Sequence, residues 1–162
     1  MRPERHRINI TPSVLDRLLD DKPKEQVEGQ SLLYFDLSRL KRAVARDMEA
    51  LLNSRCVDLD EEIQRYPQAR NSMIDYGITD LSSLSLLDPS DRAYLRDKIR
   101  ITVERHEPRL GTIRVSLDTP VGTERMLRFR VDALLKAHPT RPPVSFDATL
   151  QPSSNSCQVK EN

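Results

Sequence analysis

Apolar residues recur at two different intervals along the chain, and each interval predicts one kind of secondary structure. Over residues 31–55 they are three or four positions apart, which places them on one face of an α-helix. The charged residues fall mostly on the other side, so we expect the apolar face to pack on a sheet. This face comprises Leu33, Leu37, Leu40, Val44, Met48 and Leu51.

Start signals predict two further helices. Over residues 88–107, Asp88 is placed as an N-cap before a proline at the first helical position, and Asp91 is placed to complete a capping box. Residues 12–20 predict a short amphipathic helix capped by Thr11. Its apolar stripe either folds back onto its own domain or enters a groove of a partner, and the sequence leaves both open. The stripe consists of Val14, Leu15, Leu18 and Leu19.

After the second long helix the interval changes to two, and apolar and polar residues alternate in three successive segments. Such alternation predicts strands with one buried face and one solvated face. The segments cover residues 111–118, 125–133 and 144–150, and turn residues between them favour an antiparallel meander. The predicted fold class is therefore α+β, with helices packed on a small antiparallel β-meander.

The domain organisation follows from the same pass along the chain. Residues 1–30 are expected to form a flexible N-terminal arm that carries the short helix, and residues 31–150 to form the α+β domain. Residues 151–162 are polar and are expected to be a disordered tail. No apolar run is long enough to span a bilayer and no signal-peptide pattern is recognised, so we expect a cytoplasmic protein.

The charge balance and the cysteines narrow the function classes. Charged residues make up 31% of the chain but the formal net charge is only +1, so the two signs are interspersed. Nucleic-acid-binding domains commonly show a basic face, which this balance argues against. Cys56 and Cys157 lie far apart, have no CxxC partner and are expected to be free thiols.

One segment, "ERHEPRLG" at residues 104–111, concentrates charge where the second long helix should end. Pro108 cannot continue a helix and disfavours the helical conformation for the residue before it, so the helix should end near His106. An extended segment should follow, in which Glu107 and Arg109 point the same way.

Four interpretations of this segment compete. Glu104 and Glu107 could be the paired carboxylates of a glycan hydrolase, but the chain has no Trp and few aromatic residues to stack on a sugar. A metal site at His106 lacks other ligands at suitable spacing. The segment could be a solvated helix end, or a recognition element. In the latter, Arg109 offers a planar fork to a partner, and Glu107 either orients that fork or receives a partner's arginine.

Four segments resemble one known family. "EPRL" at the end of a helix, just before alternating strands, is similar to the signature of the phage baseplate wedge and sheath-initiator family. "SVLDRLLDD", "DMEALLNSR" and "SMIDYGITDLSSL" resemble the TssE branch of that family, which belongs to type VI secretion systems. The four segments occur in the family's order, and the resemblance covers roughly residues 13–150.

The resemblance implies a non-catalytic structural protein with the fold of the contractile sheath's handshake domain. Such a protein docks in the baseplate wedge and initiates sheath polymerisation by strand addition. Glu107, Pro108 and Arg109 are then implied in contacts with neighbouring baseplate components. The implied partners are wedge proteins of the TssF, TssG and TssK kinds and sheath subunits of the TssB and TssC kinds, at the cytoplasmic face of the inner membrane. No cofactor, metal, nucleic acid or small-molecule substrate is implied.

Two alternatives to this function stay open, an adaptor without a role in the sheath and a lysozyme-like glycan hydrolase. A loop also has two interpretations. Gly77 is expected to take a positive φ and turn the chain, and with Tyr76 it forms either a turn of the core or a surface for a partner.

Overall fold

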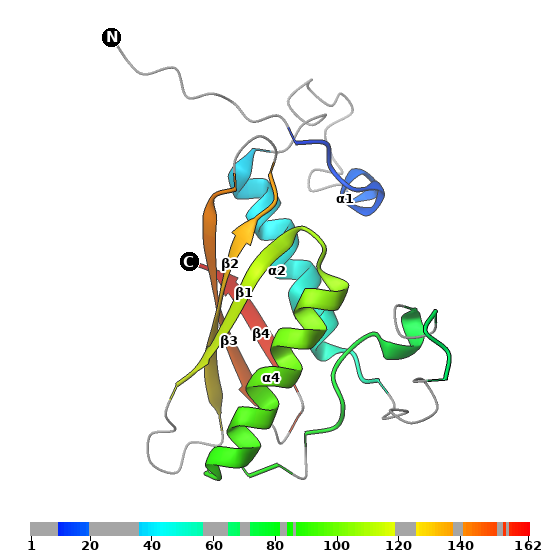
Figure 1. Ribbon diagram of the computed structural model, residues 1–162. Coiled ribbons are helices and arrows are strands. Elements are labelled where there is room, and N and C mark those ends of the chain that lie inside the picture. The colour runs from blue at the N-terminus through cyan, green and yellow to red at the C-terminus, as the bar shows by residue number, and fades with distance from the viewer. Residues whose placement is uncertain are drawn as a thin grey trace.

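A four-stranded antiparallel sheet carries the fold, and two long helices lie on one side of it (Figure 1). The computed structural model describes residues 10–19, 36–56, 65–68, 72–81, 84–85, 87–118, 126–137, 141–151, 154 and 156–162. Leu33, the predicted linker after the short helix and most of the connection between the first two strands lie outside these ranges.

The strands follow one another in space in the order in which they occur in the chain, β1-β2-β3-β4. The three predicted strands are present, each within two residues of its expected ends, so the α+β meander is confirmed. The strands are β1 (Leu110–Leu117), β2 (Leu127–Leu135), β3 (Pro143–Gln151) and β4 (Ser156–Glu161).

The prediction of a disordered C-terminal tail is wrong, because β4 extends the sheet beyond β3. Cys157 and Val159 alternate with polar residues and are only 2% and 8% exposed. Two apolar residues are too few for a period of two to be recognised in a polar sequence. Pairing with β3 and burial of these two side chains together order the segment.

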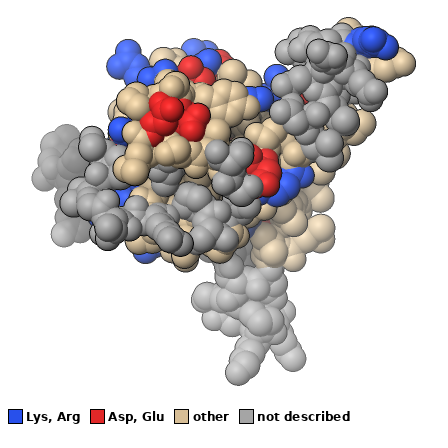
Figure 2. Space-filling model, turned by 90° about the horizontal axis from the view of Figure 1, so that it is seen from below, with Lys and Arg blue, Asp and Glu red and all other residues tan. Residues whose placement is uncertain are grey.

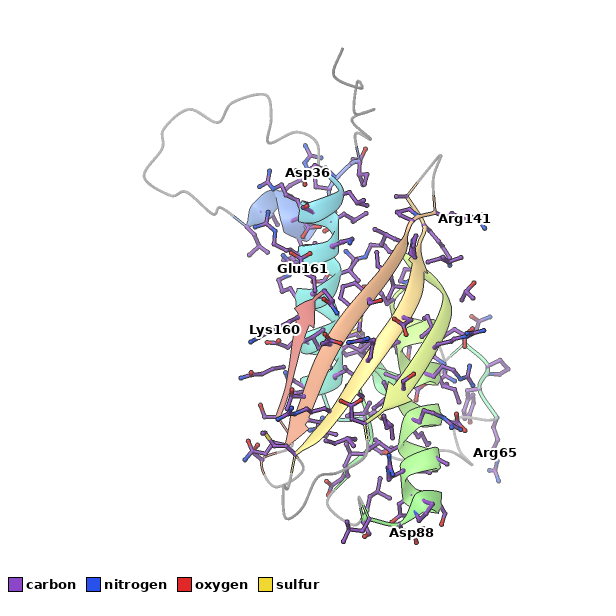
Figure 3. The ribbon with its side chains drawn as sticks, turned by 90° about the vertical axis from the view of Figure 1, so that its left-hand side faces the viewer. Asp36, Arg65, Asp88, Arg141, Lys160 and Glu161 are labelled. Atoms are coloured by element: carbon purple, nitrogen blue, oxygen red, sulfur yellow. The ribbon has the colours of Figure 1, made fainter. Side chains whose placement is uncertain are left out.

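Helices α2 (Leu37–Asn53) and α4 (Pro89–His106) supply the other layer of the core. Figure 3 shows both behind the sheet, with α2 near β4 and α4 near β1, and these pairs of elements are packed together. Val44 and Met48 on α2 and Ile99 on α4 are fully buried, which confirms that the predicted stripe of α2 faces the sheet. Phe146, also fully buried, meets this core from the sheet side.

The start of α4 agrees with its sequence signals in part. Asp88 is the N-cap and its Oδ1 accepts a hydrogen bond from the backbone N–H of Ser90 at 2.8 Å. Asp91 does not complete a capping box, since its Oδ2 instead accepts from the backbone N–H of Ser85 at 2.7 Å. Ser85, which precedes the cap, therefore binds the carboxylate that a capping box would require.

The face of the sheet away from the helices is solvated, as the alternation predicted. Arg130 on β2 and Asp147 on β3 form an ion pair there at 2.7 Å, and about half of each side chain is exposed. Water screens such exposed pairs, so this one contributes little to stability.

Figure 2, which views the molecule from below, shows described side chains of both signs rather than one large patch of a single sign.

Neither cysteine is bonded to the other, in agreement with the expectation of free thiols. Burial, together with the nearby Glu49 carboxylate, raises the pKa of the Cys157 thiol to about 12, so this thiol is inert. None of the helices in the described ranges combines the length and apolarity that crossing a membrane requires.

Gly77 turns the chain where the segment before α4 meets the end of α2. Its φ is +116°, and a Cβ at this position would lie 2.5 Å from the backbone oxygen of Ser54. That close approach lets Ile78 donate its N–H to the same oxygen at 3.0 Å. Tyr76 is half-buried against the core, so Tyr76 and Gly77 belong to a turn packed on the domain.

Gly77→Ala should lower the free energy of unfolding by about 1–3 kcal/mol, because the new Cβ meets backbone and the positive φ is strained. Gly111→Ala is the matched control, since its Cβ would meet mainly the flexible Lys136 side chain. Urea denaturation of both variants beside the wild type measures the difference. Equal, small losses in the two variants would contradict this account of the turn.

Candidate functional site

The segment around Pro108 forms a tight turn between α4 and β1. Glu107 is the C-cap of α4, with φ −118° and ψ 80°, so the predicted helix end is confirmed. The predicted extended segment is wrong, because the N–H of Leu110 donates to the carbonyl oxygen of Glu107 at 3.1 Å and closes a four-residue turn. Proline favours the second position of such a turn, since its φ is already fixed.

Glu107 and Arg109 bind each other across this turn. Glu107 is buried, with 3% of the residue exposed. The Arg109 Nε donates to Glu107 Oε1 at 2.7 Å, and its Nη2 donates to the second carboxylate oxygen. The backbone N–H of Arg109 also donates to Oε1, at 3.2 Å. A buried carboxylate is costly unless it is paired in this way.

Asp47 of α2 extends the pair to a second element. The Nη2 of Arg109 donates to Asp47 Oδ2 at 2.7 Å, across 62 positions of the sequence. The other carboxylate oxygen of Asp47 accepts from Nε and Nη2 of Arg46, at 2.9 and 2.7 Å. One aspartate therefore binds two guanidinium groups and ties the α4–β1 turn to α2.

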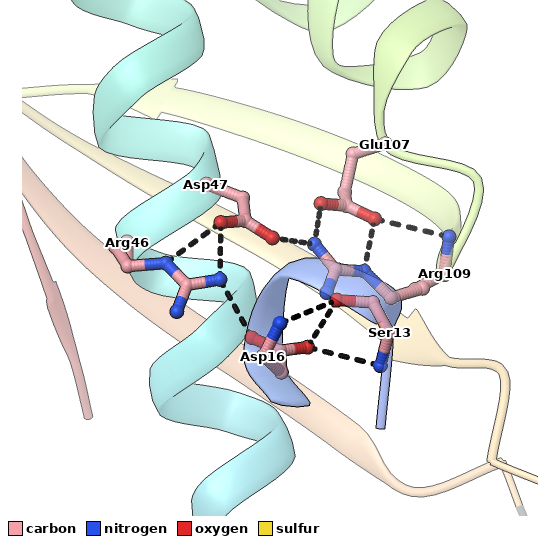
Figure 4. A network of polar contacts seen from close by, with 6 residues as sticks. All are labelled: Ser13, Asp16, Arg46, Asp47, Glu107 and Arg109. Atoms are coloured by element: carbon pink, nitrogen blue, oxygen red, sulfur yellow. Dashed lines mark hydrogen bonds and ion pairs between the residues drawn. The ribbon is translucent and has the colours of Figure 1, made fainter. Parts of the chain in front are cut away.

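The N-terminal helix, α1 (Val14–Leu18), joins the same set of contacts (Figure 4). Arg46 Nη2 donates to Asp16 Oδ1 at 2.7 Å. Ser13, not Thr11, is the N-cap, and it forms a capping box with Asp16. Thr11 is too early because Pro12 precedes the helix instead of starting it. We refer to Asp16, Arg46, Asp47, Arg109 and Glu107 as the ion-pair network.

The network contains three carboxylates and two guanidinium groups, which alternate in sign along its length. Burial alone would lower the pKa of Arg109, but the Glu107 and Asp47 carboxylates outweigh it and raise that pKa. Burial would raise the pKa of Asp16, but hydrogen bonds from Ser13 and Arg46 outweigh it and hold that pKa below its ordinary value. Both groups therefore stay charged at neutral pH.

The network involves the polar side of α1, and the apolar side faces solvent. Asp16 on the polar side binds Arg46, while the four apolar side chains of the stripe are between 47% and 76% exposed. An amphipathic helix on a domain ordinarily has the opposite orientation. Val14, Leu15, Leu18 and Leu19 therefore offer apolar surface that the domain does not use.

A short turn, η3 (Met73–Asp75), packs against the end of α4 next to the network. His106 Nε2 donates to the backbone oxygen of Asp75 at 2.9 Å, and the ring of Tyr76 meets the imidazole edge-on at 5.3 Å between centroids. Burial, with Arg105 beside it, lowers the pKa of His106. Burial and the Asp47 and Glu107 carboxylates raise the pKa of Tyr76, which places this loop close to the network.

The arrangement does not support hydrolase or metal chemistry. Glu104 is 62% exposed and pairs with Arg100, whereas Glu107 is neutralised by Arg109, so the two carboxylates do not form an acid–base pair. Among the residues that the structure describes, no group of three or more His, Cys, Asp and Glu side chains could hold a metal.

Sequence reasoning identified Glu107 and Arg109 but missed Asp16, Arg46 and Asp47. Arg46 and Asp47 belong to the polar side of α2, where nothing in the helix period distinguishes them from other solvated charges. Asp16 lies between apolar residues of the stripe, so the sequence pattern did not indicate that it takes part in a long-range ion pair. Only the packing of α1 and α4 beside α2 gives these residues a shared environment.

The match of a family model agrees with the resemblance of the four segments. The model of a family described as baseplate wedge protein gp25 matches residues 38–140. No curated protein matches the sequence. A solved structure described as the baseplate complex from the type VI secretion system contains a similar chain, with 14% sequence identity and a TM-score of 0.48. The match covers 76% of this chain and 94% of that one.

Arg109→Ala should lower the free energy of unfolding by about 3–5 kcal/mol, because it leaves the Glu107 carboxylate buried and unpaired. Arg100→Ala removes an exposed helix ion pair and should cost less than about 1 kcal/mol. Chemical denaturation of both variants gives the comparison. The network would have no structural role if the two losses were the same.

The stability of the fold should decrease as the pH falls below about 6.5, the ordinary pKa of histidine. The pKa of His106 is lowered in the folded state. Between the lowered pKa of the folded state and the ordinary pKa, the unfolded chain therefore binds more protons than the folded chain. The contribution of neutral His106 to the free energy of unfolding is fully present only above the ordinary pKa and is lost as the pH falls. His106→Gln keeps a donor for the Asp75 oxygen and should flatten this dependence. An unchanged pH slope in the variant, measured by urea denaturation between pH 5 and 8, would exclude His106 as its source.

Proposed function

The chain belongs to the family of baseplate wedge protein gp25, and on this premise we propose that it is a structural component of the baseplate of a type VI secretion system. A baseplate wedge protein is a structural component and not an enzyme, so the hydrolase alternative is dropped. The assignment to type VI secretion is supported by the three segments that resemble the TssE branch, which occur in order with the "EPRL" signature of the family. The proposed location is the cytoplasmic face of the inner membrane.

The observation that carries the proposal is the convergence of those four segments on one region. "SVLDRLLDD" contains α1 and "DMEALLNSR" begins in the second half of α2 and runs past its end. The ion pair of Arg46 with Asp16 joins the two helices just before that second stretch. The "EPRL" turn binds Asp47, and the loop with η3 packs on the end of α4 beside it. Segments that are distant in sequence thus contact one another in one region of the molecule.

Within this region, Glu107 and Arg109 position the turn, and more exposed groups are available to a partner. Glu107 is buried and bonded within the chain, so a direct contact of its carboxylate with a partner would require the pair to open. Pro108 is exposed, and 27% of the Arg109 side chain remains accessible. The proposed contact to other wedge subunits combines Pro108 and the outer part of Arg109 with the apolar side of α1. Tyr76 meets the ring of His106 at the end of α4, so the turn that contains Tyr76 and Gly77 lies beside this proposed contact.

The second part of the proposed function is initiation of the sheath. Sheath subunits of the TssB and TssC kinds would add a strand to the sheet of this chain, because strand edges carry backbone groups that pair with an extended segment. The four-stranded meander with one layer of helices leaves two such edges. An adaptor without a sheath role remains the second candidate, and sheath binding separates the two.

Replacing Leu15 and Leu18 together by Asp should weaken binding to a complex of the TssF, TssG and TssK kinds at least tenfold, without changing the melting temperature. Both side chains are more than half exposed, so the fold does not depend on them. Leu87→Asp is the matched control, because Leu87 is 79% exposed just before α4, far from the network. Interferometry with the purified complex measures the affinity.

Loss of binding in the double variant with retention in the control would support α1 as the contact. Equal affinity of all three proteins would exclude α1 but leave the wedge assignment in place. If the wild-type chain binds no wedge complex, the proposed function itself is wrong.

A further inference from the structure

The two edges of the sheet differ in how their outward-facing backbone groups are used. On β4, the N–H of Asn162 donates to the oxygen of Ser145 at 3.0 Å, which fixes which residues face β3. In an antiparallel ladder these alternate with residues that face away. Given the register of β4 against β3, Cys157 and Val159 direct their backbone N–H and C=O groups away from the sheet.

Helix α2 closes this edge with two side chains. The Asn53 amide accepts from the N–H of Cys157 at 2.8 Å and donates to its carbonyl oxygen at 2.9 Å, as the peptide group of a neighbouring strand would. Glu49, one turn earlier on α2, accepts from the N–H of Val159 through Oε2 at 2.8 Å. A strand that added beside β4 would have to displace all three hydrogen bonds.

The edge at β1 has no comparable closure. The N–H of Asp118 donates to the oxygen of Arg128 at 2.9 Å, so the alternate residues Val115 and Leu117 direct their backbone groups away from β2. Among the described residues, no group is hydrogen-bonded to these outward N–H and C=O groups. The register shift between Gly111 and Arg114 lies before this stretch, which then runs regularly to Leu117.

We propose that the β1 edge, over residues 113–117, is where an extended segment of a sheath subunit adds as a fifth strand, and that the β4 edge does not accept it. This inference rests on the proposed role in sheath initiation and deepens it by naming the edge. The added strand pairs with the backbone of Val115 and Leu117. Its apolar side chains, at every second position, cover Ile113 and Leu117, which are only half-buried in the free chain.

Charge on α4 further defines the occupant. Arg92, Arg96 and Arg100 are four residues apart and so lie on one side of the helix. The Nη2 of Arg92 donates to the carbonyl oxygen of Asp118 at 3.1 Å, which places the start of this row at the end of β1. The ion pairs that Arg96 and Arg100 make with neighbouring acids are exposed and therefore weak.

The row favours a strand with acidic residues among its polar positions. A second copy of this chain is a poorer occupant, since pairing β1 with its own copy around a two-fold axis would bring two arginine rows toward each other. The expected partner segment therefore alternates apolar residues with Asp or Glu.

Hydrogen exchange on the unmodified chain tests the edge directly. In the free protein the amides of Val115 and Leu117 should exchange quickly, and those of Cys157 and Val159 slowly because α2 binds them. On adding purified sheath subunits of the TssB and TssC kinds, Val115 and Leu117 should become protected by tenfold or more. Protection that appears at the β4 edge instead would overturn the inference and leave sheath initiation standing.

Two proline variants test whether sheath binding depends on the β1 edge. Leu117→Pro removes one outward N–H without removing a hydrogen bond to β2, and Glu161→Pro does the same on β4. We expect Leu117→Pro to weaken sheath binding at least tenfold and Glu161→Pro to leave it unchanged, with melting measured for both. The reverse ranking contradicts the edge assignment.

Two further outcomes separate the inference from the function on which it rests. If the free chain already shows protection of Val115 and Leu117 that rises with its own concentration, a second copy occupies the edge and the inference is wrong. If the wild-type chain binds no sheath subunit in either assay, sheath initiation fails together with it, while binding to the wedge complex still reports on the baseplate role.

Discussion

The buried carboxylate of Glu107 is the constraint on which the arrangement of the helices depends. Ionised groups lose several kcal/mol of hydration on burial, so Glu107 requires a cation beside it. Arg109 meets that need from the other side of the proline turn, and Arg109 in turn is oriented by Asp47 of α2. Asp47 also binds Arg46, and Arg46 binds Asp16, so the same series of ion pairs extends to α1.

The apolar and polar sides of helix α2 make different contacts. Its apolar side, with Val44 and Met48, is fully buried against the core. Of its polar residues, Arg46 and Asp47 belong to the ion-pair network, whereas Glu49 and Asn53 bind the outer edge of β4. The surfaces proposed for other proteins, the apolar side of α1 and the edge of β1, lie outside these contacts of α2.

This division is consistent with the proposed docking of the chain among other baseplate subunits. Charged groups inside the network are paired within the chain, so the proposed wedge-facing surface would be held in place before any partner binds. A closed β4 edge and an open β1 edge would let an incoming strand add in one place only, and natural sheets commonly restrict their edges in this manner. Both proposed surfaces exist in the free chain and require no rearrangement of the core.

Local sequence patterns correctly predicted the elements with strong periodicity. The stripe of α2, the cap and proline of α4, the helix end before Pro108 and the three alternating strands follow from local preferences that act within a few residues. The positive φ of Gly77 also follows, because only glycine tolerates it freely. The resemblance of four short segments identified the family for the same reason, since each is a local pattern.

Tertiary structure alone decided what contacts what. β4 orders because Cys157 and Val159 are buried against the core, not because its sequence favours a strand. Asp47 and Arg109 meet across 62 positions, and Asn53 reaches Cys157 across 104, which no local period can indicate. The outward direction of the α1 stripe likewise involves the ion pair of Asp16 with Arg46, 30 positions away, so the local sequence pattern alone did not indicate it.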